Sequence, residues 1–359
     1  MIAKQPAKKK REARPVAAPL SKPSYWDEVG IGKPNASALK AALADTVLVD
    51  AAWLAKLADE KGVLPRCQDL PNDARVTLEE MERWKSSSTV GVLVVSYPWW
   101  APPHSTLAYI CLVAPAASAP GSPFTNCAPR LDADHPDKKG LQLRAMSNVL
   151  KMFDKEAKKK YGVFCKVGVF IDYVSMPQRS RGSSSDDRTP GQKATFDRSL
   201  QACPPTCPPT ACSPLVSHPA LPAPYQAIRH WYGHPTTHVL LVDTNLPAGA
   251  HTNMQPYAGR GWCAMERQTS GLVKNSTALI SLKGLTGKER NIWEVRRNGK
   301  AAREPPVAPK SFAKKLKDGV ASEAITFTNP ADVDLVAIIY REAFTAANSN
   351  PNPNPNPNP

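Results

Sequence analysis

Four apolar runs rich in β-branched residues constrain the fold of this chain more than any other feature of the sequence. They cover residues 90–96, 167–173, 237–243 and 277–282, and helical patterns separate them along the chain. A strand buried on both faces reads as an unbroken apolar run, and repeated strand–helix units favour a parallel sheet with helices on both sides. The sequence therefore predicts an α/β fold.

Apolar residues at helical spacing identify the elements between the strands. They predict helices at 140–160 and 262–273, and a third helix made of 193–200 joined with 226–232. The sheet domain with its helices would span residues 89–282. Residues 283–347, with a helix at 333–344, predict a C-terminal helical extension.

Residues 26–88 predict a helical N-terminal region. A helix over 37–61 would start at a serine N-cap, and Thr77 and Glu80 have the spacing of a capping box. The apolar positions at helical spacing in 37–61 are Leu39, Ala42, Leu43, Val47, Leu54 and Leu57.

Proline marks the parts of the chain that do not fit this fold. The chain has 37 prolines in 359 residues, too many for a uniformly folded protein, so that much of it is expected to be linker or tail. Residues 1–25 predict a disordered basic arm and 348–359, an Asn-Pro repeat, a disordered tail. The low-complexity inserts 101–130 and 202–224 interrupt the domain, either as surface insertions or as retained intron sequence.

The net charge and the cysteine content indicate which partners and which cellular compartment to expect. The net charge is +15, and the first basic cluster reads as an import or anionic-surface signal or as a solubilising tail, so nucleic acid is expected to make only non-specific contact with this arm. The eight cysteines show no disulfide framework, and no apolar signal segment opens the chain. These features predict a cytoplasmic protein, or with the import signal a nuclear one, without a membrane partner.

Several familiar site types are not indicated. Cys203, Cys207 and Cys212 with His218 are irregularly spaced for zinc, and residues 132–137 read as a turn before a helix rather than a calcium loop. The chain has no phosphate-binding glycine loop, HExxH or GxSxG motif. No metal and no resident cofactor is therefore expected.

Polar residues follow the first three predicted strands, where parallel sheets bind ligands. They are Ser96 and Tyr97 after the first strand, Asp172 and Gln178 after the second, and Asp243 after the third. Each alone is more typical of a turn or a cap. Together they would line one cleft.

The stretch 257–266 (YAGRGWCAME) adds Arg260, Trp262 and Glu266 at a predicted helix start. Trp262 and Glu266 are four residues apart and share a helix face, so the indole would partly desolvate the acid and tune its chemistry. The alternative is a buried tryptophan beside a surface acid. Glu266 is the candidate catalytic residue of the chain.

The order of these motifs resembles the heterokaryon-incompatibility (HET) domain. The residues that carry the resemblance are 94–99 (VVSYPW), 169–178 (VFIDYVSMPQ), 231–232 (WY) and 260–266 (RGWCAME). The likeness covers about residues 90–282 and extends to the Toll/interleukin-receptor (TIR) fold, which implies a flavodoxin-like parallel sheet. The chain departs from the family pattern at 174–176 and at Met265, which bears on activity rather than on fold.

The resemblance implies two functions, and a third remains open. The first is an intracellular signalling module that associates with itself or with another signalling protein. The second is cleavage of the nicotinamide–ribose bond of NAD, with NAD as substrate and Glu266 as the carboxylate, a ring stacked on Trp262 or Tyr97, phosphate on Arg260 and ribose on Asp172. The third is an inert structural α/β protein.

Overall fold

The computed structural model describes the sheet, its helices and the C-terminal extension, with gaps. The residues described are 38–77, 80, 91–98, 135–179, 186–200, 227–244, 255–327, 329 and 331–348. The predictions for the basic arm, the Asn-Pro repeat beyond residue 348 and the inserts 101–130 and 202–224 lie outside these residues.

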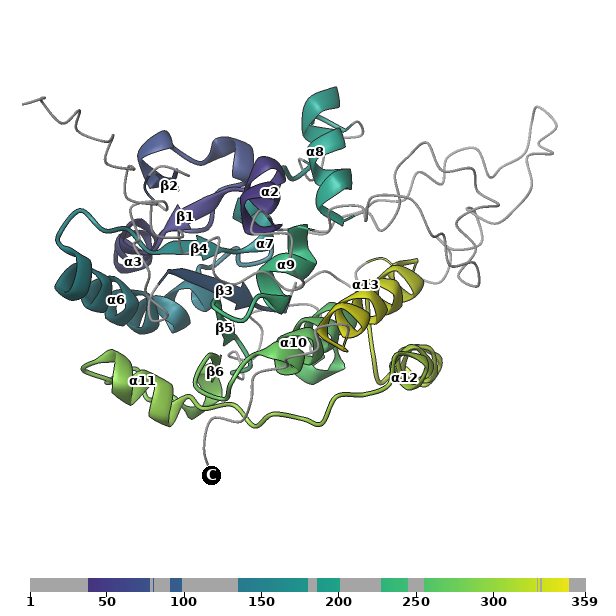
Figure 1. Ribbon diagram of the computed structural model, residues 1–359. Coiled ribbons are helices and arrows are strands. Elements are labelled where there is room, and N and C mark those ends of the chain that lie inside the picture. The colour runs from purple at the N-terminus through teal and green to yellow at the C-terminus, as the bar shows by residue number, and fades with distance from the viewer. Residues whose placement is uncertain are drawn as a thin grey trace, which may run out of the picture.

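A six-stranded mixed sheet forms the centre of the fold (Figure 1). Its order is β2-β1-β4-β3-β5-β6, and the four strands from β4 to β6 are parallel. The predicted α/β class is therefore correct. The strands are β1 Leu48–Asp50, β2 Arg75–Val76, β3 Val92–Ser96, β4 Gly168–Phe170, β5 His238–Leu241 and β6 Leu279–Ser281.

The centre of the sheet lies at β3, which pairs with β4 on one side and β5 on the other. All five residues of β3 are completely buried, as its unbroken apolar run predicts. Because the chain turns to opposite sides of β3 in these two crossovers, ligand sites are expected at the carboxyl ends of these strands.

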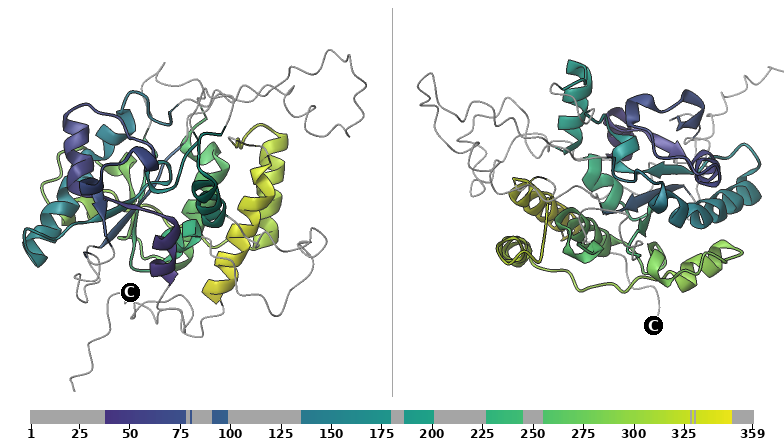
Figure 2. Two further views of the ribbon diagram at one scale, coloured as in Figure 1. Left: turned by 90° about the horizontal axis from the view of Figure 1, so that it is seen from above. Right: turned by 180° about the vertical axis from the view of Figure 1, so that it is seen from behind.

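Helices cover both faces of the sheet (Figure 2). One face carries α3, α6 and α11, and α6 contacts both of the others; the other face carries α2, α9 and α10, with α13 packed on α10 and α12 packed on α13. Short helices α7 and α8 lie near the carboxyl end of β4. The helices are α2 Ala38–Asp45, α3 Ala51–Asp59, α6 Leu141–Tyr161, α7 Asp172–Ser175, α8 Pro190–Leu200, α9 Ala227–Gly233, α10 Gly261–Val273, α11 Ile292–Asn298, α12 Pro309–Ala321 and α13 Asp332–Asn348.

The single helix predicted over 37–61 is wrong. The segment forms α2, then β1, then α3, and β1 pairs antiparallel with both β4 and β2. Two local contacts explain the break: the Thr46 hydroxyl donates to the Ala42 carbonyl at the end of α2 (2.6 Å), and the Asp50 carboxylate caps α3 by accepting from the Ala52 amide (3.1 Å). The β-branched residues between them extend the sheet instead.

Other helix predictions fare differently. The capping box is present, because the Thr77 amide donates to Glu80 and the Glu80 amide to the Thr77 hydroxyl. Residues 135–140 form a turn before α6, and Asp137 caps that helix by accepting from the Leu141 and Leu143 amides. The predicted joined helix appears as two, α8 and α9, with residues 201–226 outside the described chain.

The C-terminal extension is part of the same body as the sheet. It contributes α11 to α13, and α13 packs along α10. Residue Thr326 forms a parallel bridge with Arg260, so the segment before α13 lies against the start of α10. Across the described residues, no helix combines the length and apolar character that crossing a membrane requires.

Candidate functional site

A cavity of about 210 Å³ lies where the carboxyl ends of β3 and β4 meet the start of α10. Six of the eight residues predicted as site residues line it. The lining residues are Tyr97, Asp172, Met176, Gln178, Phe196, Ile228, Arg260, Gly261, Trp262, Cys263, Glu266, Thr326, Phe327, Asn329 and Asp332. Pockets for whole drug-sized ligands measure roughly 300–1,000 Å³, so this cavity is too small for a complete dinucleotide.

Glu266 lies at the wall of this cavity and is only 5% exposed. Its Oε2 is 2.5 Å from the hydroxyl of Ser96, the last residue of β3, which is itself completely buried. The Ser96 hydroxyl is also 2.5 Å from the Tyr257 hydroxyl, which donates to the Cys263 carbonyl. With Glu266 neutral, all three bonds form, because Glu266 donates to Ser96, Ser96 to Tyr257 and Tyr257 to the Cys263 carbonyl. With Glu266 ionised, Ser96 donates to the carboxylate and Tyr257 donates to Ser96, so the bond to the Cys263 carbonyl is given up.

The surroundings of Glu266 favour its neutral form. Burial raises the pKa of Glu266 well above its ordinary range, and the negative charge of Asp172 raises it further, while hydrogen bonds with Ser96 and Tyr232 oppose the shift. No described cation forms an ion pair with it. Any positive charge that enters the cavity would therefore favour release of the proton.

Asp172 and Gln178 come from the loop that leaves β4, and they differ in what they offer a ligand. Asp172 begins α7, and its carboxylate accepts from the Tyr173 amide (2.7 Å) while lining the cavity. The Gln178 side-chain amide donates to the carbonyls of Asp172 (3.2 Å) and Met176 (3.1 Å). Both amide hydrogens of Gln178 thus hold this loop, and Asp172 contributes a carboxyl group to the cavity lining.

Arg260 and Trp262 frame the other side of the cavity at the start of α10. Arg260 is 6% exposed, and its Nε donates to the Gln255 carbonyl (3.2 Å); burial lowers its pKa. The Trp262 indole Nε1 donates to Asp332 Oδ2 at 2.9 Å. This bond fixes the indole plane against the cavity, so the tryptophan is a wall of the site rather than part of the core.

The C-terminal segment closes the cavity at this point. The Gly261 amide donates to the Thr326 carbonyl (3.0 Å) and the Thr326 amide to the Gly259 carbonyl (2.8 Å). The ring of Phe327 lies so close to Gly261 that a Cβ atom there would be 1.9 Å from Phe327 Cζ. Glycine at 261 is therefore what lets the ring reach the cavity.

The cavity combines two kinds of lining. Four aromatic rings line it, those of Tyr97, Phe196, Trp262 and Phe327. The carboxyl groups of Glu266, Asp172 and Asp332 and the Arg260 guanidinium share the same space. Aromatic faces and carboxylates both attract cations. The site suits a flat, positively charged ring.

The two remaining predicted residues lie outside this lining. Ser96 acts through its bond to Glu266. Asp243 accepts from the Ser281 hydroxyl (2.6 Å) and the Lys283 amide (3.0 Å), and so ties the exit of β5 to that of β6.

The sequence reasoning did not find Thr326, Phe327, Asn329 and Asp332, all in the C-terminal extension. One signal was present in the chain: glycines on both sides of Arg260 indicate that another segment approaches the backbone closely. Nothing in the local pattern identifies that segment.

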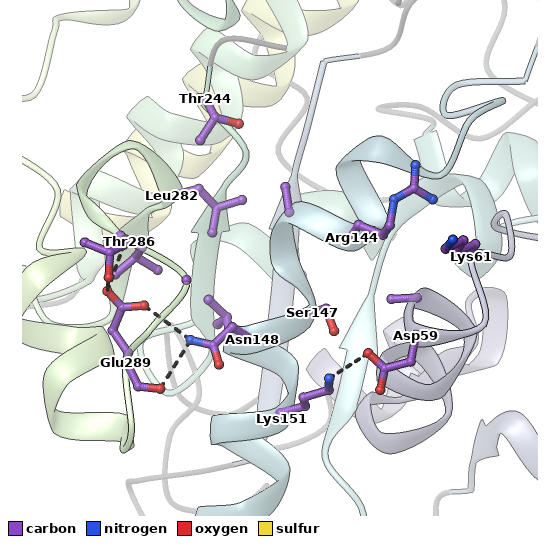
Figure 3. A pocket seen from close by; sticks show the side chains of 15 residues that line it. Asp59, Lys61, Arg144, Ser147, Asn148, Lys151, Thr244, Leu282, Thr286 and Glu289 are labelled. Carbon is purple, nitrogen blue, oxygen red and sulfur yellow. Dashed lines mark hydrogen bonds and ion pairs between the residues drawn. The ribbon is translucent and has the colours of Figure 1, made fainter. Parts of the chain in front are cut away.

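A larger hollow of about 660 Å³ lies elsewhere, along α6, with the end of α3 on one side and residues 282–289 on the other (Figure 3), and it contains none of the predicted site residues. Within the described ranges, no cluster of three or more His, Cys, Asp or Glu side chains could hold a metal ion. The cysteines at 203, 207 and 212 lie outside them.

Comparison with known proteins gives no match: no protein-family model, no curated protein and no solved structure is similar to this chain.

Proposed function

We propose that this chain is a HET/TIR-like module whose cavity binds the nicotinamide–ribose part of NAD and cleaves the bond between them. The observation that carries this proposal is that the buried Glu266 carboxyl lines one small cavity together with Asp172 and the Trp262 ring. The nicotinamide ring of NAD is cationic and planar, which is the chemistry that this lining attracts.

The electrostatics of Glu266 give the reaction a physical basis. The cationic ring lowers the pKa of the acid when it binds, so the proton leaves and a carboxylate faces the ribose carbon that loses nicotinamide. As the bond breaks, positive charge moves onto the sugar, and a desolvated carboxylate stabilises it strongly. Nicotinamide leaves as a neutral molecule, and water adds to the sugar.

The other residues take supporting roles in this proposal. Asp172 accepts a hydrogen bond from a ribose hydroxyl, the ring stacks on Trp262 or Tyr97, and Arg260 pairs with phosphate at the cavity mouth. Because the cavity measures only about 210 Å³, the remainder of the dinucleotide lies outside it.

The order of the parallel strands supports the fold part of the proposal. Numbered along the chain, they run 2-1-3-4 across the sheet, which is the beginning of the flavodoxin-like order 2-1-3-4-5. The antiparallel β1 and β2 are an addition to that order.

The test is to incubate purified protein with NAD and follow nicotinamide and ADP-ribose by chromatography. We expect release by the wild type and a loss of about 100-fold or more in Glu266→Gln, as for other groups that stabilise transition-state charge. The matched control is Glu304→Gln, because Glu304 binds Gln268 and Arg267 of α10 but does not line the cavity. Release that survives in Glu266→Gln contradicts the role of this residue.

A second candidate function is self-association or association with a signalling partner, and exposed apolar side chains favour it. Val163 is 71% exposed, Phe164 92% and Trp293 70%. Sedimentation velocity of the wild type against a Phe164→Ser, Trp293→Ser double variant tests it. Concentration-dependent association that the double variant abolishes supports this function, and a monomer at all concentrations contradicts self-association.

A further inference from the structure

The larger hollow lies on the face of the sheet that α3 and α6 cover. Its walls are the end of α3, one side of α6, Thr244, three residues beyond the end of β5, and the segment 282–289. Its volume of about 660 Å³ is in the range of small-molecule sites, roughly 300–1,000 Å³. None of its lining residues lines the cavity around Glu266.

Two hydroxyl groups in this hollow have no partner among the described residues. Ser147 on α6 is 8% exposed, and its Oγ makes no hydrogen bond; Oγ1 of Thr244, just beyond β5, is also buried without one. A buried hydroxyl without a partner is unfavourable, and most such groups in folded proteins are satisfied. Two around one hollow indicate that something else satisfies them.

Three of the charged side chains around the hollow already have partners within the protein. Lys151 pairs with Asp59 at 2.6 Å, and Glu289 accepts from the Thr286 amide and hydroxyl and from Asn148. These four side chains and Thr286 are satisfied within the protein. Both described acids of the hollow are therefore already bonded.

Two cations remain. Arg144 has one hydrogen bond within the described chain, to the Lys139 carbonyl (2.6 Å), and Lys61 has no ion pair there. Figure 3 shows these two side chains on one side of the hollow and Leu282, Thr286 and Glu289 on the other, with Ser147 between. The side with Arg144 and Lys61 also carries Asp59, which is paired with Lys151, and the opposite side carries the bonded carboxylate of Glu289 beside Leu282 and Thr286.

We propose that this hollow is a second ligand site, which binds a small molecule carrying a carboxylate or phosphate group. The anionic group lies at Arg144 and Lys61, and guanidinium binds either oxyanion through paired N–H donors. The body of the ligand lies over Leu282 and accepts or donates hydrogen bonds at Ser147 and Thr244.

The experiment titrates the full chain with two probes, benzoate and phenyl phosphate, by calorimetry. We expect at least one to bind, and the tighter of the two identifies the oxyanion. Arg144→Gln should weaken that binding about tenfold or more, since it removes a charge-assisted bond. Lys155→Gln, an exposed lysine on the same helix outside the hollow, should leave it unchanged.

Ser147→Ala separates a ligand role from a structural one. Because its hydroxyl has no partner within the protein, removing it should raise the urea midpoint of unfolding while weakening probe binding severalfold. A lower midpoint would show that the hydroxyl serves the fold and would overturn the proposal. So would the absence of binding by both probes at tens of millimolar, or unchanged binding in Arg144→Gln and Ser147→Ala.

Discussion

Two glycines of α10 make a matched pair that tests how the C-terminal segment closes the cavity. A Cβ atom at Gly261 would be 1.9 Å from Phe327 Cζ and 2.3 Å from two more ring atoms, whereas at Gly271 it would meet nothing within 4 Å. Gly271 lies inside the helix, where alanine gains about 1 kcal/mol of helix propensity, and Gly261 is the first helical residue, where the gain is smaller. The larger part of the difference between the two variants is the steric cost at Phe327.

That cost is set by how far the ring can retreat. The ring must move by about 1.5 Å to reach ordinary van der Waals contact. Its backbone cannot follow easily, because Thr326 is bonded to both Gly259 and Gly261. Overpacking of this kind costs about 1–3 kcal/mol. Gly271→Ala should therefore stabilise the protein by about 0.5–1 kcal/mol, and Gly261→Ala should be about 1–3 kcal/mol less stable than Gly271→Ala.

The assay is urea unfolding of both variants, followed by circular dichroism, with nicotinamide release as a second readout. Displacing Phe327 changes the cavity wall, so Gly261→Ala should also lose tens of fold in release, since a shift of about 1 Å near a reacting group costs about 100-fold. Equal stability of the two variants within about 0.5 kcal/mol would refute the close packing of Phe327 on Gly261.

Three further predictions concern buried polar groups. Burial and Asp172 raise the pKa of Glu266, so the folded state holds a proton that the unfolded state releases: its stability contribution is full below about pH 4.5 and is lost as pH rises through the folded pKa. The free energy of unfolding of the wild type, measured in urea, should fall between pH 5 and 8, and Glu266→Gln should remove up to about 1.4 kcal/mol per pH unit of this fall. The same pH slope in both proteins would contradict the prediction. Burial and nearby Arg296 lower the pKa of His238 to about 3, so the stability from its neutral form is present above pH 6.5 and is lost as the pH falls toward 3. His238→Gln should reduce the dependence of the free energy of unfolding on pH in this range by up to about 1.4 kcal/mol per pH unit. An unchanged dependence would speak against a neutral buried imidazole. Asp332→Ala removes the acceptor of the Trp262 indole, so it should destabilise the protein by about 1–3 kcal/mol and impair nicotinamide release. The control is Asp334→Ala, which removes an exposed residue of the same helix, α13, that pairs with Lys317 of α12, and it should cost less than about 1 kcal/mol.

Residue patterns predict the parallel strands and the long helices because their signals are local. An unbroken apolar run such as β3 identifies a buried strand, and Tyr97, Asp172 and Gln178 line one cavity because parallel strands end at the same edge. Arg260, Trp262 and Glu266 join them from the start of α10. The short strands β1 and β2, of three and two residues, are too brief for periodicity to reveal.

The contribution of the C-terminal extension could not be predicted for a different reason. Phe327 and Asp332 reach the cavity through contacts across about 70 residues of chain, such as Asp332 with Trp262. No spacing rule links segments that far apart. The glycines beside Arg260 signal a close approach, but tertiary packing decides what approaches.

The most direct test of the account is the pH dependence of binding of 1-methylnicotinamide, a cationic ring, compared with neutral nicotinamide. If the cation displaces the proton of Glu266, its affinity should rise with pH between 5 and 8 by up to tenfold per unit, and nicotinamide should show no such rise. In Glu266→Gln the rise should disappear while Glu304→Gln keeps it. Equal affinity of the wild type for both rings at every pH would contradict the claim that a buried acid in this cavity recognises a cationic ring.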